Sequence, residues 1–323
     1  MAKAVRYFRH GGPDVLQLDE VDVGEPGAGQ VRIRHTAIGV NFVDTYQRSG
    51  LYPMPLPAVA GNEAAGVVDA VGSGVSDFKK GDRVAYTSLP GSYCEMRGVP
   101  ADRVVKIPDG VSDAQAASMM LKGMTVHYLV FSTYAVKRGE TVLWHAAAGG
   151  VGLIAVQWLK ALGVTTIGTA GSDEKCAIAR AHGADHVVNY STENFVERVV
   201  AITGGQKVPV VYDSVGKSTW EGSLDCLRPR GLMVSFGNAS GAVPPVNLGV
   251  LSMKGSLYVT RPTLATYIAT REELVERSRA LFDAVRSGKV KIETTKEYRL
   301  ADAAQAHRDL EGRKTTGSVV LIP

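Results

Sequence analysis

The middle of the chain alternates short apolar runs, rich in valine, leucine, isoleucine and threonine, with segments whose apolar residues recur at helical spacing. The runs predicted as strands are residues 141–144, 164–169, 185–190, 209–213 and 232–236. The predicted helices lie at residues 150–160, 173–182, 193–202 and 219–227. Strands and helices that alternate in this way form a parallel sheet covered by helices. The pattern therefore predicts an α/β fold with a doubly wound, Rossmann-type parallel sheet.

Residues 1 to about 120 follow a different pattern, in which short β-rich runs are broken by glycine and proline. The predicted strands are residues 2–8, 16–21, 30–37, 66–71 and 83–86. Runs of this kind indicate an antiparallel, partly barrel-like domain. Beyond the α/β region the pattern predicts a helix, a strand, a helix and a last strand, at residues 271–287, 291–299, 302–311 and 317–322.

The junction between the first strand and the first helix of the α/β region consists of small residues. In a G-x-G-x-x-G fingerprint, Gly149 and Gly152 are the second and third glycines, and Ala147 stands in place of the first. Backbone N–H groups and the positive end of a helix meet at such a turn and bind a pyrophosphate. An ordinary tight turn is the alternative, and the strand–helix–strand order favours the dinucleotide site. The candidate residues are Gly149, Gly150, Val151 and Gly152.

Length and charge narrow the possible partners. A chain of 323 residues is long enough for two domains with sizeable cores. Its 36 basic and 32 acidic residues give a net charge of +4, too small to require a nucleic acid or an anionic membrane. No stretch approaches the roughly 20 apolar residues that span a bilayer. The first residues show no signal-peptide pattern, and Cys94, Cys176 and Cys226 lie far apart, so we expect a cytoplasmic protein.

The glycine junction and its surroundings resemble one family. Residues 139–160 fit the signature of the quinone oxidoreductases of the zeta-crystallin type, in the medium-chain dehydrogenase/reductase superfamily. Further segments that fit are residues 39–44, 60–63, 121–125, 236–238, 260–262 and 317–323. The resemblance implies a discontinuous GroES-like catalytic domain at residues 1–123 and 263–323, and a dinucleotide-binding Rossmann domain at residues 124–262. It also implies a homodimer through the β-prone residues 255–260, for which a simple edge strand is the alternative.

The end of the second predicted strand bears on the choice of nicotinamide cofactor. An NAD site usually carries Asp or Glu there to bind the ribose 2′-OH, whereas residues 169–172 are Thr, Ala, Gly and Ser. These small residues leave room for a 2′-phosphate, and Lys175 and Tyr190 can contact one. The resemblance implies the same phosphate role for Lys175 and Tyr190, and a further basic contact from Arg313. We therefore expect NADPH, with the phosphate-side candidates Gly171, Ser172, Lys175, Tyr190 and Arg313.

A different interpretation of this turn remains open. Ser172 caps the following helix in that interpretation, and Lys175 is a solvated surface charge. Asp173 and Glu174 lie in the same first helical turn, where they stabilise the helix dipole but oppose a phosphate.

The zinc ligands of the alcohol dehydrogenase branch are missing from this sequence. Asn41 occupies the position of the first cysteine ligand, and Asn62 that of the histidine ligand. The sequence also lacks four close cysteines for a structural zinc, so we expect no metal. Hydride transfer to a simple ketone creates a strongly basic alkoxide that needs a Lewis acid or a strong proton donor. A quinone or an enone spreads the charge onto a far less basic oxygen, because phenols titrate near pH 10.

Polar residues at 39–50 are candidates for the surroundings of the reacting hydride. Helical spacing puts Asn41, Asp44 and Arg48 on one side of this segment. The resemblance places the segment near the nicotinamide and makes Asn41 and Asp44 cofactor contacts. For Asp44 and Arg48 the alternative is a helical ion pair worth a few tenths of a kcal/mol.

Two tyrosines complete this group. We expect Asn41 and Tyr46 to bind the cofactor or the reduced carbonyl oxygen, and Tyr52 to line the quinone pocket. A packed aromatic ring whose hydroxyl finds a partner is the alternative for either tyrosine. The resemblance adds cofactor contacts elsewhere, with Phe236 also a candidate core residue: Thr125, Tyr128, Val215, Phe236, Gly237, Asn238 and Ser240.

These expectations describe a zinc-independent, NADPH-dependent quinone reductase. An enone or alkenal double-bond reductase that shares the same site is the rival enzyme. A sensor or RNA-binding protein that keeps NADPH affinity without turnover is the rival from another class, and the absence of a basic-aromatic patch counts against it.

Overall fold

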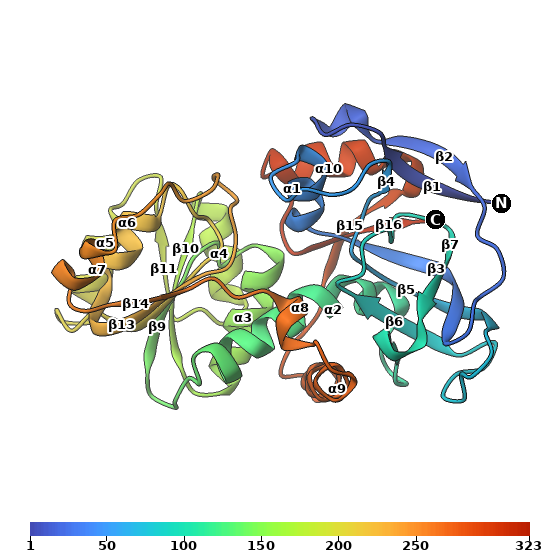
Figure 1. The fold of residues 1–323 in the computed structure, drawn as a ribbon. Coiled ribbons are helices and arrows are strands. Elements are labelled where there is room, and N and C mark those ends of the chain that lie inside the picture. Colours follow the sequence, from blue (N-terminus) through green and yellow to red (C-terminus); the bar gives the residue numbers. More distant parts are fainter. The chain divides into compact units, whose positions relative to one another are not determined.

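The computed structural model describes residues 1–323 and divides into two compact units (Figure 1). Unit 1 comprises Met1–Met124, Tyr267–Arg286 and Ile292–Pro323. Unit 2 comprises Thr125–Thr266 and Ser287–Lys291. No helix is both long and apolar enough to cross a membrane.

Unit 2 is built on a six-stranded sheet in which every neighbouring pair is parallel. In chain order its strands are β9 (Thr141–Trp144), β10 (Thr165–Ala170), β11 (His186–Asn189), β12 (Val208–Asp213), β13 (Leu227–Ser235) and β14 (Tyr258–Thr260). The spatial order is β11-β10-β9-β12-β13-β14. This confirms the predicted doubly wound sheet, although β13 begins at Leu227, earlier than the predicted 232. In such a sheet ligands bind at the carboxyl ends of the strands where the order reverses, here between β9 and β12.

Helices cover both faces of this sheet (Figure 1). The helices α3 (Gly150–Ala161) and α4 (Asp173–Ala181) share one buried cluster, which includes Val156, Cys176 and Ala179. On the opposite face α5 (Phe195–Ile202), α6 (Trp220–Asp225) and α7 (Gly249–Met253) pack around Val199, Trp220 and Leu224. Because both faces are covered, all six residues of β12 are buried, which explains why this strand is apolar up to Asp213 at its end.

Unit 1 contains a seven-stranded and a three-stranded sheet. The larger sheet follows the order β15-β16-β3-β5-β6-β8, with β7 also paired to β3, and the smaller follows β2-β1-β4. All pairs are antiparallel except β15–β16. The strands are β1 (Ala2–Tyr7), β2 (Gln17–Val21), β3 (Gln30–Val40), β4 (Ala58–Val59), β5 (Glu63–Val71), β6 (Arg83–Thr87), β7 (Met96–Pro100), β8 (Val104–Lys106), β15 (Thr294–Arg299) and β16 (Ser318–Ile322).

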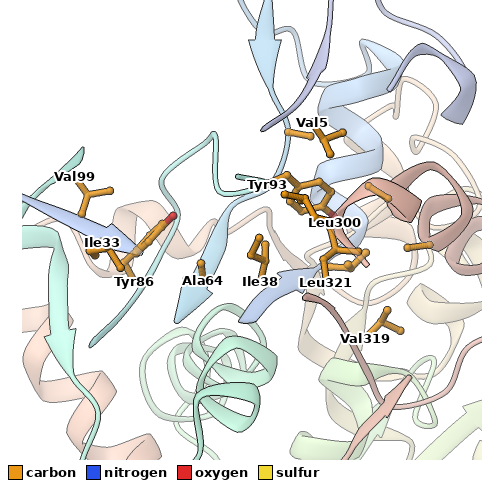
Figure 2. Packing of buried hydrophobic residues seen from close by; sticks show 14 of the residues in the cluster. Val5, Ile33, Ile38, Ala64, Tyr86, Tyr93, Val99, Leu300, Val319 and Leu321 are labelled. Carbon is orange, nitrogen blue, oxygen red and sulfur yellow. The ribbon is translucent and has the colours of Figure 1, made fainter. Parts of the chain in front are cut away.

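The core of unit 1 combines side chains from both ends of the sequence (Figure 2). Ile33 and Ile38 of β3 belong to the same cluster as Val319 and Leu321 of β16. β16 pairs with β3 in antiparallel register, so the last strand of the chain lies between β3 and the edge strand β15 in the larger sheet. Side-chain burial of this kind is the main stabilising contribution to such a domain.

Five helices belong wholly or partly to unit 1: α1 (Phe42–Ser49), α2 (Asp113–Tyr128), α8 (Leu264–Tyr267), α9 (Arg271–Arg286) and α10 (Ala303–Glu311). The boundary between the units falls within α2 and again within α8. The hydrophobic pattern did not predict α2, whereas α1, α9 and α10 lie where helical or turn-rich segments were expected.

Candidate functional site

The turn between β9 and α3 has the form expected of a pyrophosphate site. Gly149 is the N-cap of α3, with extended backbone and no capping side chain. The first N–H groups of an α-helix have no partner within the helix, so those of Gly150, Val151 and Gly152 can bind an anion. A Cβ on Gly152 would lie 2.3 Å from the carbonyl oxygen of Ala146, so only glycine allows this close approach.

The turn after β10 contains Gly171 and Ser172, and Lys175 lies in the first turn of the helix α4 that follows. Ser172 Oγ accepts a hydrogen bond from the backbone N–H of Lys175 at 3.3 Å, which confirms that Ser172 caps α4. Asn189 Nδ2 donates to Asp173 Oδ1 at 2.8 Å, so this carboxylate already has a neutral donor. Tyr190, 36% exposed, directly follows β11. Lys175 in the first turn of α4 and Tyr190 after β11 are the two side chains predicted to contact a 2′-phosphate, and Asp173 already accepts a hydrogen bond from Asn189.

The turns after β12 and β13 are fastened to each other. The backbone N–H and the hydroxyl of Ser240 both donate to the carbonyl oxygen of Val215, at 2.8 Å each. Arg261 Nη1 donates to the carbonyl oxygen of Gly237 at 2.9 Å, which brings together two of the segments that carry the family resemblance. The ring of Phe236 lies 5.7 Å from that of Trp144, so the Phe236 side chain contributes to packing.

The remaining unit 2 candidates lie at the end of α2. Thr125 and Tyr128 are 7% and 2% exposed, respectively. Both side chains are therefore largely enclosed by protein.

In unit 1, Asn41 lies within a buried polar cluster. It is the N-cap of α1, and its backbone N–H donates to Asp44 Oδ2 at 2.8 Å. Its amide nitrogen Nδ2 donates to Glu63 Oε1, also at 2.8 Å. Glu63 is fully buried and accepts a second bond from the backbone N–H of Leu121 at 2.7 Å, while Lys122 Nζ lies 3.4 Å away. Three segments that carry the family resemblance, around residues 41, 63 and 122, thus meet at Glu63.

Asp44 and Arg48 share the buried side of α1, as predicted, but they do not form the ion pair considered from the sequence. Arg48 pairs with Glu311 of α10, with an Nη2–Oε1 distance of 2.7 Å. Asp44 instead accepts hydrogen bonds from Asn62 Nδ2 at 2.7 Å and from the hydroxyl of Tyr93 at 2.9 Å. Helical spacing could not reveal these partners, because they come from distant segments. Burial raises the pKa of Asp44 to about 6, despite these donors.

The two candidate tyrosines of unit 1 pack against each other. The rings of Tyr46 and Tyr52 are 5.3 Å apart in an edge-to-face arrangement, and Phe42 packs on Tyr46 at 6.1 Å. The backbone N–H of Tyr52 donates to the carbonyl oxygen of Tyr46 at 3.0 Å. The structure therefore places Tyr46 of α1 against Tyr52 in the loop that follows this helix. Arg313 also belongs to unit 1, just after α10, with a positive φ of 56°.

The positions of the zinc ligands are occupied by amides that have carboxylate partners. Asn41 donates to Glu63, and Asn62 donates to Asp44 and to Gln47 Oε1, the latter at 2.7 Å. No group of three or more His, Cys, Asp or Glu side chains is arranged to hold a metal ion.

Several buried polar residues of the two units that hydrogen-bond to one another were not identified as candidates from the sequence. They carry no local signal, because their partners lie far away in the chain. The residues are Glu63, Tyr93, Lys122, His145, Asp213, Ser223 and His307. For Glu63 and Lys122 the only available signal was their place in segments that resemble the family.

Two family profiles match the chain. The alcohol dehydrogenase GroES-like domain matches residues 27–109, and the zinc-binding dehydrogenase profile matches residues 150–277. A quinone oxidoreductase of Pseudomonas aeruginosa is 55% identical over 325 residues, which cover 100% of both chains. The crystal structure of Escherichia coli quinone oxidoreductase complexed with NADPH has a TM-score of 0.98 at 54% identity, covering 100% of both chains. A 2-haloacrylate reductase of a Burkholderia species is 49% identical over 333 residues, which cover 100% of this chain and 99% of that protein.

The GroES-like and Rossmann-type sheets define the class, and the relatives define the branch. The chain belongs to the medium-chain dehydrogenase/reductase superfamily and, within it, to the quinone oxidoreductases of the zeta-crystallin type.

Proposed function

We propose that this protein is an NADPH-dependent quinone reductase that needs no metal. The observation that carries the proposal is the glycine turn at the start of α3, because its geometry suits a pyrophosphate and no side chain caps the helix. Relatives at 54% and 55% identity over the full length are quinone oxidoreductases, and one of them is complexed with NADPH. NADPH supplies a hydride when bound.

The residues of unit 2 hold the cofactor in this proposal. Gly149, Gly150, Val151 and Gly152 bind the pyrophosphate through backbone N–H groups. Gly171 and Ser172 in the turn after β10 bind the 2′-phosphate in this proposal, and the resemblance to the family adds the side chains of Lys175, Tyr190 and Arg313. The remaining contacts come from the end of α2 and from the turns after β12 and β13: Thr125, Tyr128, Val215, Phe236, Gly237, Asn238 and Ser240. The capping role of Ser172 is compatible with this, because its backbone N–H remains available.

The residues of α1 and the following loop serve the reacting end of the cofactor. Asn41 and Asp44 contact the cofactor, and Tyr46 binds either the cofactor or the reduced oxygen. Tyr52 lines the quinone pocket. The bonds of Asn41 to Glu63 and of Asp44 to Asn62 support this assignment, since they hold both side chains in fixed orientations before any ligand arrives.

A conjugated acceptor suits this set of residues. Asn41 and Asn62 stand where the zinc-dependent branch has metal ligands, and amides that donate to carboxylates do not hold a zinc ion that could act as the Lewis acid. The oxygen of a quinone takes up charge as a phenolate-type anion, which hydrogen bonds and solvent can stabilise.

Steady-state oxidation of NADPH, followed by absorbance, tests the proposed reaction. We expect 1,4-benzoquinone or a naphthoquinone to give a higher kcat/KM than an α,β-unsaturated ketone of similar size. Tight NADPH binding without oxidation by any quinone would support the sensor or RNA-binding alternative instead.

One observation favours a second candidate activity, reduction of an activated carbon–carbon double bond. The Burkholderia relative at 49% identity is a 2-haloacrylate reductase. Its acceptor also delocalises the charge of the incoming hydride, so the same residues could serve both reactions. A higher kcat/KM for 2-chloroacrylate than for benzoquinone would assign the protein to this activity.

We also infer that the protein is a homodimer that works in the cytoplasm. β14 forms one edge of the unit 2 sheet, and Tyr258 and Val259 on it are 62% and 39% exposed. An exposed apolar edge strand favours pairing with a second copy. The three cysteines are buried free thiols, which supports a reducing compartment.

A further inference from the structure

Four fully buried side chains in unit 2 form one continuous set of hydrogen bonds, here called the His145 network. Thr169 Oγ1 lies 2.9 Å from His145 Nδ1, and His145 Nε2 lies 3.0 Å from Ser223 Oγ. Ser223 Oγ in turn lies 2.8 Å from Asp213 Oδ2. His145 follows β9, Thr169 belongs to β10 and Asp213 ends β12, so the network joins the carboxyl ends of three strands through α6.

Each proton in the His145 network has one possible place. The Asp213 carboxylate only accepts, so the single hydroxyl proton of Ser223 points to it. Ser223 must therefore accept from His145, which puts the imidazole proton on Nε2. Burial lowers the pKa of His145, so its other nitrogen is an acceptor and receives the proton of Thr169.

This order of donors excludes a nucleophilic role, although Ser, His and Asp are all present. In a catalytic triad the serine gives its proton to the histidine, and the carboxylate orients that histidine. Here Ser223 gives its proton to Asp213, and His145 donates to Ser223. None of the three is exposed to solvent. The network is therefore a connection between structural elements and not a reaction centre.

At its far end, the His145 network fixes the turn after β12. Asp213 Oδ1 accepts from the backbone N–H groups of Val215 at 2.7 Å and Gly216 at 3.0 Å. Thr219 Oγ1 donates to Asp213 Oδ2 at 2.7 Å. Gly216 has a positive φ of 89°, and a Cβ there would lie 2.7 Å from the carbonyl oxygen of Gly241. The turn after β12 is therefore held in one conformation, and it packs closely against the turn after β13.

At its near end, the network reaches the turns that bind the pyrophosphate and the 2′-phosphate of the cofactor in the proposed function. The backbone N–H of Ala147, within the glycine turn, donates to the carbonyl oxygen of Thr169 at 2.9 Å. Thr169 is followed directly by Ala170 and by Gly171, at the start of the 2′-phosphate turn. One buried residue thus contacts the turns after β9 and β10 through its backbone and its side chain.

We propose that His145, Ser223 and Thr169 are positioning residues that set the spacing between the turn for the adenosine 2′-phosphate and the turn after β12. When the spacing is correct, the turn for the 2′-phosphate and the turn after β12 can bind NADPH at the same time. The three side chains act through this spacing and do not contact NADPH themselves. NADPH needs both turns at the correct distance from each other, whereas adenosine 2′,5′-bisphosphate needs only the turn for the 2′-phosphate. The inference rests on the proposed function, because it takes these turns to be the cofactor site.

The test compares two ligands on three variants. Ser223→Ala breaks the network at its centre, Thr169→Val removes the donor to His145, and Thr169→Ser keeps that donor as the matched control. We expect Ser223→Ala and Thr169→Val to raise the Kd for NADPH by about tenfold or more, and Thr169→Ser to stay within about threefold of the original protein. For Ser223→Ala the Kd for adenosine 2′,5′-bisphosphate should remain within about twofold. Titration by intrinsic fluorescence or calorimetry measures all of these constants without turnover.

The outcomes separate this inference from the proposed function. Equal losses of affinity for both ligands, in step with a lower Tm, would mean that the network only supports the fold, and would overturn the inference. Unchanged NADPH affinity in all three variants would overturn it as well. If Ser223→Ala does not fold, Thr169→Val is compared with Thr169→Ser instead. The inference then requires that Thr169→Val weakens the binding of NADPH more than the binding of adenosine 2′,5′-bisphosphate. Failure of the original protein to bind NADPH would instead overturn the proposed function, and the inference with it.

Discussion

At the scale of single residues, the polar groups around α1 are committed to one arrangement. A carboxylate accepts and does not donate, so the Asn41 amide must turn its nitrogen toward Glu63. Lys122 is almost fully buried beside Glu63, and a buried carboxylate without such partners would be costly. The orientation of Asn41 is therefore set by residues that no ligand needs to contact. Such preorganisation is what a cofactor site on a rigid scaffold requires.

The Tyr46→Phe variant tests whether a tyrosine hydroxyl is an essential proton donor. Phenylalanine keeps the packing on Tyr52 and Phe42, so the site should stay intact. We expect kcat with a quinone to fall by less than about tenfold, because a phenolate-type product needs no strong acid. Steady-state kinetics measure the effect, with Tyr52→Phe as the matched variant. A loss of kcat beyond about a hundredfold at unchanged KM would make Tyr46 the proton donor.

The Lys175→Glu variant tests the choice between NADPH and NADH. Lys175 lies in the first turn of α4, where a new carboxylate would repel a 2′-phosphate but not a 2′-hydroxyl. We expect the ratio of kcat/KM for NADPH over NADH to fall by at least about tenfold. Lys160→Glu, at the exposed end of α3, reverses the same charge elsewhere in unit 2 and should leave the ratio unchanged. An unchanged ratio in Lys175→Glu would remove Lys175 from the cofactor site.

Residues at the glycine turn could be predicted because their signal is local. A strand, small residues and a helix follow one another within about a dozen positions, and the structure has all three. The partners of Asp44 and Arg48 could not be predicted in the same way. Tyr93 and Glu311 lie far from α1 in the sequence, and only the folded β-sheets bring them close. The helical ion pair considered for Asp44 and Arg48 was wrong for this reason.

At the scale of elements, the strength of the periodicity separates the elements that were predicted from α2, the longest of those that were missed. The strands β9, β10, β11 and β12 are short apolar runs, and each was predicted to within one residue at either end, whereas β13 begins five residues before the predicted 232. By contrast, α2 is buried nearly all round, including Ala116, Met119, Met120 and Met124. A helix that is apolar on all sides has no hydrophobic period to detect.

The edge strand β14 provides a prediction at this scale. Its exposed backbone edge and the exposed Val259 suit antiparallel pairing with the same strand of a second copy. We expect Val259→Lys to convert a dimer into a monomer, because like charges would face each other across the pair. Sedimentation equilibrium or light scattering measures the mass, with Phe8→Lys, an exposed apolar residue of unit 1, as the control. If the original protein is already a monomer at micromolar concentration, the dimer proposal fails without any variant.

At the scale of the whole molecule, several histidines are buried in the neutral form. Burial lowers the pKa of His35 to about 4 and that of His307 to about 3. Each is held in unit 1 by hydrogen bonds to a tyrosine hydroxyl, His35 to Tyr86 and His307 to Tyr93. An imidazole that is neutral when folded and protonated when unfolded couples the folding of unit 1 to pH.

The sign of this coupling predicts acid destabilisation. The folded pKa values of His35 and His307 are depressed, so their contribution to stability is present above the unfolded value near 6.5 and is lost as the pH falls toward 4. Between pH 7 and pH 5 each removes about 2 kcal/mol from the free energy of unfolding. Asp44 acts in the opposite direction. Its folded pKa is raised to about 6, and its protonation on acidification returns about 1 kcal/mol. For His35, His307 and Asp44 together, the expectation is a loss of about 3 kcal/mol.

Urea unfolding of the His307→Gln variant at pH 7 and pH 5 checks this expectation. Glutamine can still donate to Tyr93 and accept from Arg48 but does not titrate, so the variant should lose about 2 kcal/mol less than the original protein between the two pH values. His186→Gln removes an exposed histidine and serves as the matched control. The comparison uses the difference between two pH values, so any constant cost of the substitution cancels. Equal losses in His307→Gln and in the original protein would show that His307 is not held neutral by the fold, and that acid acts on unit 1 through other groups.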